Sequence, residues 1–237
     1  KYFSKKVGLF SSIFWAFSYY LIRSARWFSN PSPLPFFALL LLWGLVEWLI
    51  NKKRKFIPLV LFSLAVASQL EAASAVFYYP AILFLIILFK VKIVKTIKTK
   101  WFWIGLSIFI AFLLPQLAFE LKNNFLMTKN LYGFFTGKVS TEQGQSWAIP
   151  TLKVIGSRLK FYYETFFNKL DPNLKVGLLP AIFWFVLLTL KTIRKKDQKL
   201  KLMFIFLITP LIFLFFFVGN YGNLYSYYLT GFFPVFI

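Results

Sequence analysis

Two arginines, Arg23 and Arg26, lie in a short loop between two apolar segments. The guanidinium group presents a planar fork of donors that suits phosphate, so Arg26 is a candidate phosphate ligand. The alternative is that these side chains reach out to lipid head groups while their aliphatic stems stay in apolar surroundings. Both interpretations stay open for Arg26, and the second is favoured for Arg23.

The only polar interruption of the long apolar run 56–89 is formed by Gln69 and Glu71. A carboxylate beside a membrane is costly to place and usually has a function. Glu71 either ends a helix in water or accepts hydrogen bonds from a substrate, with Gln69 as its amide partner. Glu120 and Lys122 follow a later apolar segment, and there a local surface ion pair is the competing interpretation.

The residue types exclude several kinds of chemistry. The chain has no Cys and no His, and only seven acidic residues. A thiolate nucleophile, a thiolate metal site and the commonest general base are therefore absent. No nucleotide-binding glycine motif occurs, and no acids have the spacing of metal ligands. No cofactor is evident; a divalent metal is not excluded, but no ligand set is visible and no metal-binding residue is assigned.

The composition predicts an integral membrane protein. Apolar residues make up 59% of the 237 residues, charged residues 15%, and the net charge is +21. A soluble surface needs about a quarter or more of charged residues. The basic residues cluster in short loops between apolar segments, so membrane topology and contact with anionic lipid explain them without nucleic-acid binding.

The apolar runs predict an all-α, polytopic transmembrane helix bundle that forms a single module over residues 1–237. A crossing needs about 20 residues, so the run 56–89 is long enough for a helical hairpin that turns at Gln69 and Glu71. Seven crossings and the start of an eighth are expected. They are residues 7–22, 34–50, two within 56–89, 101–119, 176–190 and 202–218, with the eighth opening near the end of the chain.

The basic loops predict the orientation in a plasma (inner) membrane. Residues 1–6, 51–55, 90–100 and 191–201 contain three, four, five and six basic residues. They all lie on one side if the crossings alternate, and that side is cytoplasmic by the positive-inside rule. The loop 120–175 then lies outside the cytoplasm.

The second half of that outer loop predicts an amphipathic helix at about residues 151–170. Apolar residues recur there at helical spacing: Leu152, Ile155, Leu159, Tyr162, Phe166 and Leu170. Such a helix lies along the outer membrane surface. Packing on the bundle and contact with lipid are both compatible with the pattern.

Two function classes fit these features: an enzyme at the outer membrane surface, or a transporter. A transporter is expected to place polar groups near the middle of the membrane and to use broken helices there. The predicted crossings are nearly free of charge at their centres, which favours the enzyme.

Four stretches, in this order, resemble segments of the bacterial GT-C-type glycosyltransferases, the relatives of protein O-mannosyltransferases and lipid A aminoarabinose transferases. They are residues 25–36, with Arg26, Asn30 and Pro31; residues 67–80, with Gln69 and Glu71; residues 114–125, with Pro115, Glu120 and Lys122; and residues 227–234, with Tyr227, Tyr228 and Pro234. The chain departs from the family pattern at Ser29, where Trp is frequent, at Lys122, where Arg is frequent, and at Asn123, where His is frequent.

The resemblance implies an enzyme that transfers a hexosyl or pentosyl group from a polyprenyl-phosphate carrier to a glycan, lipid or protein acceptor outside the cytoplasm. Similar enzymes use an acidic residue of their first outer loop, which would precede Lys1, so the chain is expected to be a fragment without the catalytic base. Arg26 and Lys122 would neutralise the departing phosphate. Asn30, Gln69 and Glu71 would bind sugar hydroxyls, and Glu120 completes the predicted substrate-binding set.

Two alternatives share the polar outer face and stay open. One is a polytopic transporter or flippase of lipid-linked saccharide, which would need access from both sides of the membrane. The other is an O-antigen polymerase or ligase, which also has many crossings and a long outer loop.

Overall fold

The computed structural model describes residues 5–17, 22, 26, 32–126, 128–129, 132, 151–166, 186, 189–190, 197–216 and 224–236. Every regular element in these ranges is a helix. The all-α class predicted from the apolar runs is therefore confirmed for the described part of the chain.

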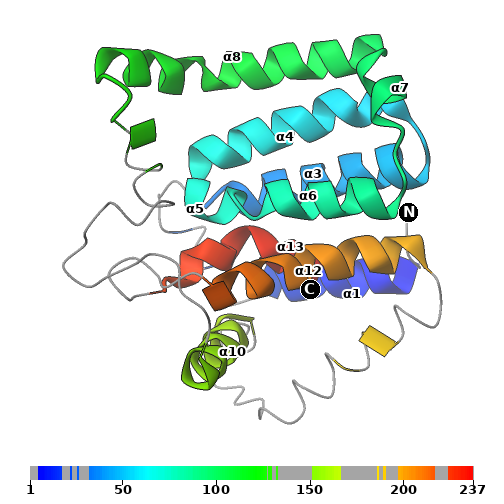
Figure 1. Ribbon diagram of the computed structural model, residues 1–237. Coiled ribbons are helices and arrows are strands. Elements are labelled where there is room, and N and C mark those ends of the chain that lie inside the picture. Colours follow the sequence, from blue (N-terminus) through cyan, green and yellow to red (C-terminus); the bar gives the residue numbers. More distant parts are fainter. Residues whose placement is uncertain are drawn as a thin grey trace.

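The helices follow the apolar segments of the sequence closely (Figure 1). Their bounds are α1 Lys5–Phe17, α3 Leu34–Leu45, α4 Ile57–Leu70, α5 Ala72–Ala75, α6 Tyr78–Leu88, α7 Ile93–Ile97, α8 Lys100–Lys122, α10 Leu152–Phe166, α12 Gln198–Phe216 and α13 Phe233–Phe236. Three further short helices are the π-helix η1 Val46–Ile50 and the 3₁₀ helices η2 Arg54–Phe56 and η3 Ser226–Phe232.

Two of the described helices, α8 and α12, are long and apolar enough to cross a membrane. The 23 residues of α8 span about 34 Å at the usual rise, slightly more than a bilayer core. Shorter apolar helices occupy Leu34–Ile50 and Ala72–Leu88. The number of seven crossings stays a prediction, and the segment 176–190 lies almost wholly outside the described residues.

The predicted hairpin 56–89 turns where the polar residues interrupt it. α4 ends at Leu70, α5 starts at Ala72, and α6 runs back antiparallel to α4 (Figure 1). α8 then packs against α4 and leaves most of its own apolar surface exposed, including Trp103, Leu114 and Leu121. A helix with so much exposed apolar surface is typical of one that faces lipid.

The core lies between α3, α4, α6, α12 and η3. Its largest fully buried side chains include Leu34, Leu41, Leu45, Tyr78, Leu85, Phe206 and Phe232. The hydroxyl of Tyr78 donates a hydrogen bond of 2.9 Å to the backbone oxygen of Gly231, which fastens α6 to η3. A side chain at Gly231 would collide with this hydroxyl, so the close approach requires glycine.

α10 packs on the bundle through its second half. Tyr162 and Phe166 are buried, and the Tyr162 hydroxyl donates to the backbone oxygen of Leu207 in α12. Pro210 lies inside α12 three residues later, and a proline disrupts the hydrogen bonding of the preceding helical turn. Leu152, at the other end of the predicted apolar stripe, is exposed. The structure thus favours packing on the bundle for the second half of this helix.

The basic turns gather at one end of the bundle. The turn 51–56, the segment 90–100 and the start of α12 lie together at the right of Figure 1. We call this the lysine-rich end. The break at Glu71, the end of α8 and η3 lie at the opposite end, which we call the Glu71 end.

Candidate functional site

The break between α4 and α5 displays the Glu71 carboxylate. The backbone of Glu71 leaves the helical region, with φ −154° and ψ 89°, while its NH still donates to the Ala67 oxygen at 3.0 Å and its own oxygen accepts from the NH of Ala75 at 2.9 Å. Its side chain caps α5 by accepting a hydrogen bond of 3.3 Å from the backbone NH of Ala73. The hydrogen bond from Ala73 holds one carboxylate oxygen. Because the side chain is only half-buried, the carboxylate can still contact a ligand.

A cluster of three tyrosines adjoins this break, because η3 packs against α5. The rings of Tyr225 and Tyr227 are stacked with centroids 5.4 Å apart, and Tyr228 meets Tyr227 edge-on at 4.8 Å. Tyr228 is buried, whereas Tyr225 and Tyr227 are 40% and 36% exposed. The cluster therefore offers aromatic faces and hydroxyls to a ligand beside Glu71.

Electrostatic effects connect Glu71 to this cluster. Partial burial raises the pKa of the Glu71 carboxyl above its usual value, and the hydrogen bond from Ala73 opposes that shift. The pKa of Tyr228 is raised by burial first, then by its hydrogen bond with Tyr227, and also by the negative charge of Glu71. Because η3 packs against α5 and the charge of Glu71 reaches Tyr228, the hairpin and η3 adjoin at this end.

Gln69 links the hairpin to α8. Its Nε2 donates a hydrogen bond of 3.2 Å to Oε1 of Gln116. One residue earlier, the hydroxyls of Ser68 and Tyr79 lie 2.9 Å apart across the hairpin. A band of uncharged polar groups thus extends from the break at Glu71 toward α8.

Glu120 lies one helical turn beyond Gln116 on the same face of α8. It is only 6% exposed, and its Oε2 accepts hydrogen bonds from the backbone NH of Thr128 at 2.9 Å and from the Thr128 hydroxyl at 2.5 Å. These contacts hold the chain that follows α8 against the helix end. Lys122, two residues later, is exposed at the end of α8.

Two predicted ligands, Arg26 and Asn30, have no described contact with this group. Arg26 is described and exposed, but most of its neighbours in sequence are not described. Asn30 lies outside the described residues. The structure therefore groups Gln69 and Glu71 at the break and leaves Arg26 and Asn30 unplaced relative to them.

Comparison with known protein families gives one match. Residues 1–119 match the model of the family described as dolichyl-phosphate-mannose-protein mannosyltransferase. That range is just over half of the chain. The chain belongs to the dolichyl-phosphate-mannose-protein mannosyltransferase family. No curated protein and no solved structure matches it.

Membership in the mannosyltransferase family makes the chain an integral membrane protein and a glycosyltransferase of the GT-C kind, as its sequence motifs predicted. The matched range contains Arg26, Asn30, Gln69 and Glu71 and ends one residue before Glu120. α10 and η3 lie beyond it, so their part in the mannosyltransferase fold is described by the structure alone.

Sequence analysis did not assign Gln116 or the tyrosine cluster to the site. Gln116 lies in the stretch 114–125, and Tyr227 and Tyr228 lie in the stretch 227–234, that resemble the GT-C enzymes. The motifs therefore held the signal, but only the fold shows that these side chains adjoin Gln69 and Glu71. Among the described residues no group of three or more candidate metal ligands gathers, and we assign none.

Proposed function

We propose that this member of the mannosyltransferase family transfers a sugar from a polyprenyl-phosphate carrier to an acceptor outside the cytoplasm, and that the Glu71 end binds the donor sugar. The observation that most directly supports this proposal is the half-buried Glu71 carboxylate beside Tyr228, at the end of the bundle opposite the basic turns. The matched family's description names dolichyl-phosphate mannose and protein, so mannose is the first donor sugar to test and a protein the first acceptor.

The proposed orientation of the bundle in the membrane follows from the positions of its basic turns. Basic turns are retained in the cytoplasm, and in the structure they share the lysine-rich end. The Glu71 end then faces away from the cytoplasm, together with α10 and the chain that follows α8. A lipid-linked donor would reach this end with its isoprenoid chain in the bilayer and its phosphate and sugar at the surface.

In the proposal, the polar and aromatic groups of the Glu71 end bind the sugar, and Arg26, which is not placed relative to them, is assigned to the phosphate together with Lys122. Glu71 and Gln69 accept and donate hydrogen bonds to sugar hydroxyls, as a carboxylate and an amide can. Tyr225 and Tyr227 present exposed ring faces that can pack against the C–H face of a sugar ring. Arg26 and Lys122 are assigned to the phosphate, whose growing charge fixed cations stabilise in the transition state.

The proposed reaction is an inverting displacement. An acceptor hydroxyl oxygen attacks the anomeric carbon, the bond from that carbon to the phosphate oxygen breaks, and the polyprenyl phosphate leaves with the bonding electrons. The acceptor proton passes to a carboxylate base, which we do not assign to a residue of this chain. The half-buried site excludes part of the water that would otherwise compete with the acceptor.

The test uses membranes that contain the complete protein and a polyprenyl phosphate carrying radiolabelled mannose. We expect label to leave the lipid and appear on an acceptor, at a rate that membranes without the protein do not show. Label that stays on the lipid but changes leaflet would contradict the proposal and identify a transporter. Label that extends a lipid-linked glycan repeat would instead identify a polymerase.

A further inference from the structure

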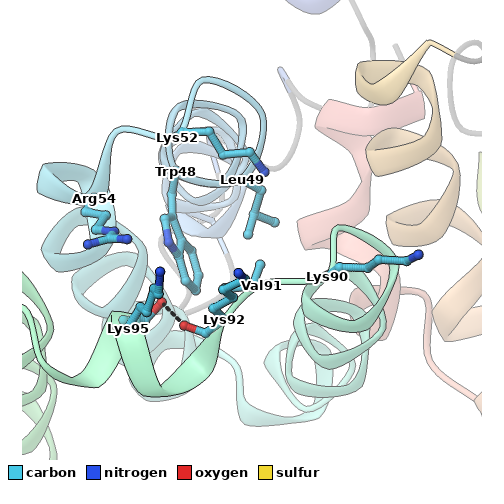
Figure 2. A pocket seen from close by; sticks show the side chains of 9 residues that line it. Trp48, Leu49, Lys52, Arg54, Lys90, Val91, Lys92 and Lys95 are labelled. Atoms are coloured by element: carbon cyan, nitrogen blue, oxygen red, sulfur yellow. Dashed lines mark hydrogen bonds between the residues drawn. The ribbon is translucent and has the colours of Figure 1, made fainter.

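A pocket of about 340 Å³ opens at the lysine-rich end (Figure 2). The elements that line it lie at the end of the bundle opposite the break between α4 and α5 (Figure 1). Its walls come from η1, η2 and the turn between them, and from α7 and the turn that joins α6 to it. The pocket therefore lies where the apolar helices α3 with η1, and α6, end. A pocket of this volume is large enough to hold a small polar ligand or a lipid head group.

The pocket is lined by five basic residues and no acidic one. The cations are Lys52, Arg54, Lys90, Lys92 and Lys95. The carboxylate of Glu47, the residue before Trp48, is buried; it pairs with Lys53 at 2.8 Å and accepts from Asn51 at 3.1 Å. Within the described residues none of the five cations forms an ion pair.

The backbone holds two of these lysines in a rare conformation. Lys52 and Lys90 have φ of 58° and 49°, in the left-handed region that residues other than glycine seldom adopt. They occupy equivalent positions, one in each of the two turns that form the pocket. In each turn the next backbone NH bonds back into the helix, Lys53 to Glu47 at 2.9 Å and Val91 to Ile86 at 3.0 Å, so the left-handed residue ends the helix and sets where its lysine leaves the backbone.

The lining is apolar next to the cations. Trp48, Leu49 and Val91 line the pocket among the basic side chains (Figure 2). Lys52 already lies over the Phe89 ring at 6.0 Å, and Lys90 extends away from Trp48 in Figure 2. Arg54, Lys92 and Lys95 are therefore the cations best placed to share one anion beside Trp48.

We propose that this pocket binds a phosphate group through Arg54, Lys92 and Lys95. The arginine supplies a fork of donors that fits phosphate oxygens, and the lysines add point charges. An anionic phospholipid and soluble phosphate can both provide this group. The apolar wall and the position at the ends of membrane helices favour the phospholipid, because basic pockets between helices on the cytoplasmic side bind anionic head groups. The inference does not depend on the proposed sugar transfer.

The test compares two matched double variants of the complete protein in detergent. Arg54→Gln/Lys95→Gln removes two pocket charges, and Lys55→Gln/Lys98→Gln removes two exposed charges from the same two segments outside the pocket. The midpoint of thermal unfolding is followed while short-chain phosphatidylglycerol, phosphatidylcholine or inorganic phosphate is added. A ligand that binds the folded state raises this midpoint, so each titration gives an apparent Kd.

We expect phosphatidylglycerol to bind the wild type and the Lys55→Gln/Lys98→Gln control with similar apparent Kd, and phosphatidylcholine to bind both weakly. Each basic residue near an anionic lipid contributes roughly fivefold, so the pocket variant should bind about 30-fold more weakly. Protection by inorganic phosphate, lost in the pocket variant only, would show that soluble phosphate is the source. If the pocket variant does not fold, Lys92→Gln replaces it, with an expected weakening of about fivefold.

Two results would overturn the proposal. One is an equal loss of binding in both double variants, which would mean that the lipid senses the total surface charge rather than the pocket. The other is the absence of protection of the wild type by either phosphatidylglycerol or inorganic phosphate.

Discussion

The Tyr78 hydroxyl donates a buried hydrogen bond of 2.9 Å to the backbone oxygen of Gly231, which lies 153 residues later in the chain. This bond fastens the second helix of the hairpin to η3. Since η3 also contains Tyr228, the same contact fixes how closely the tyrosine cluster approaches Glu71. One interior hydrogen bond thus connects the packing of the bundle to the geometry of the proposed sugar site.

Replacing Tyr78 by Phe should destabilise the protein by about 1–3 kcal/mol, because it leaves the buried oxygen of Gly231 without a partner. The free energy of unfolding in detergent measures this. Tyr79→Phe is the matched control: its hydroxyl also forms a hydrogen bond, to Ser68, but the side chain is exposed. Equal losses in the two variants would argue against a special role for the Tyr78 contact.

The ion pair between Lys53 and the buried Glu47 should stabilise the turn that leads into η2. Lys53→Gln removes the cation that pairs with the buried Glu47 carboxylate and leaves it the hydrogen bond from Asn51. We expect the free energy of unfolding to fall by about 1–3 kcal/mol. Lys55→Gln, an exposed neighbour, should change stability by less than about 0.5 kcal/mol. Adding Glu47→Gln to Lys53→Gln should recover part of the loss, and further destabilisation in the double variant would refute the pairing.

The raised pKa of Glu71 gives stability a specific pH dependence. A carboxyl whose pKa is higher in the folded state binds more protons when folded, so its contribution to stability falls as the pH rises above the usual carboxyl value of 4.5. Wild type should therefore lose stability relative to Glu71→Gln between pH 4 and pH 7.5, as measured by unfolding midpoints. A gap that stays constant, or that moves in favour of the wild type at higher pH, would contradict the burial of this carboxyl.

The positions of the helices could be predicted because apolar runs of membrane length permit little else. The hairpin break is the clearest case: Gln69 and Glu71 are the only polar interruption of the run 56–89, and α4 ends at Leu70. The ion pair of Glu47 with Lys53 could also be expected from the sequence, since the basic cluster 52–55 follows Glu47 closely in the chain.

The faces of the helices could not be predicted in the same way. α6 is apolar on all sides, so its sequence does not show that Tyr78 faces η3 while Ile87 is exposed. The contact between Gln69 and Gln116 and the approach of Tyr228 to Glu71 join segments far apart in the chain. Such contacts depend on how the helices pack, which periodicity does not encode. Sequence analysis did not predict the pocket at the lysine-rich end, because membrane topology alone explained its lysines.

The most direct test of the account is the rate of sugar transfer by Glu71→Gln, measured against donor concentration. The Gln side chain keeps the shape of the Glu side chain but removes its charge, and a hydrogen bond to a charged group contributes about 1.5–3 kcal/mol. We therefore expect kcat/KM for the polyprenyl-phosphate sugar to fall about 10- to 100-fold. Asp197→Asn, at the lysine-rich end, should transfer at the wild-type rate. A Glu71→Gln protein that matches the wild type in kcat/KM would contradict the placement of the sugar site at this carboxylate.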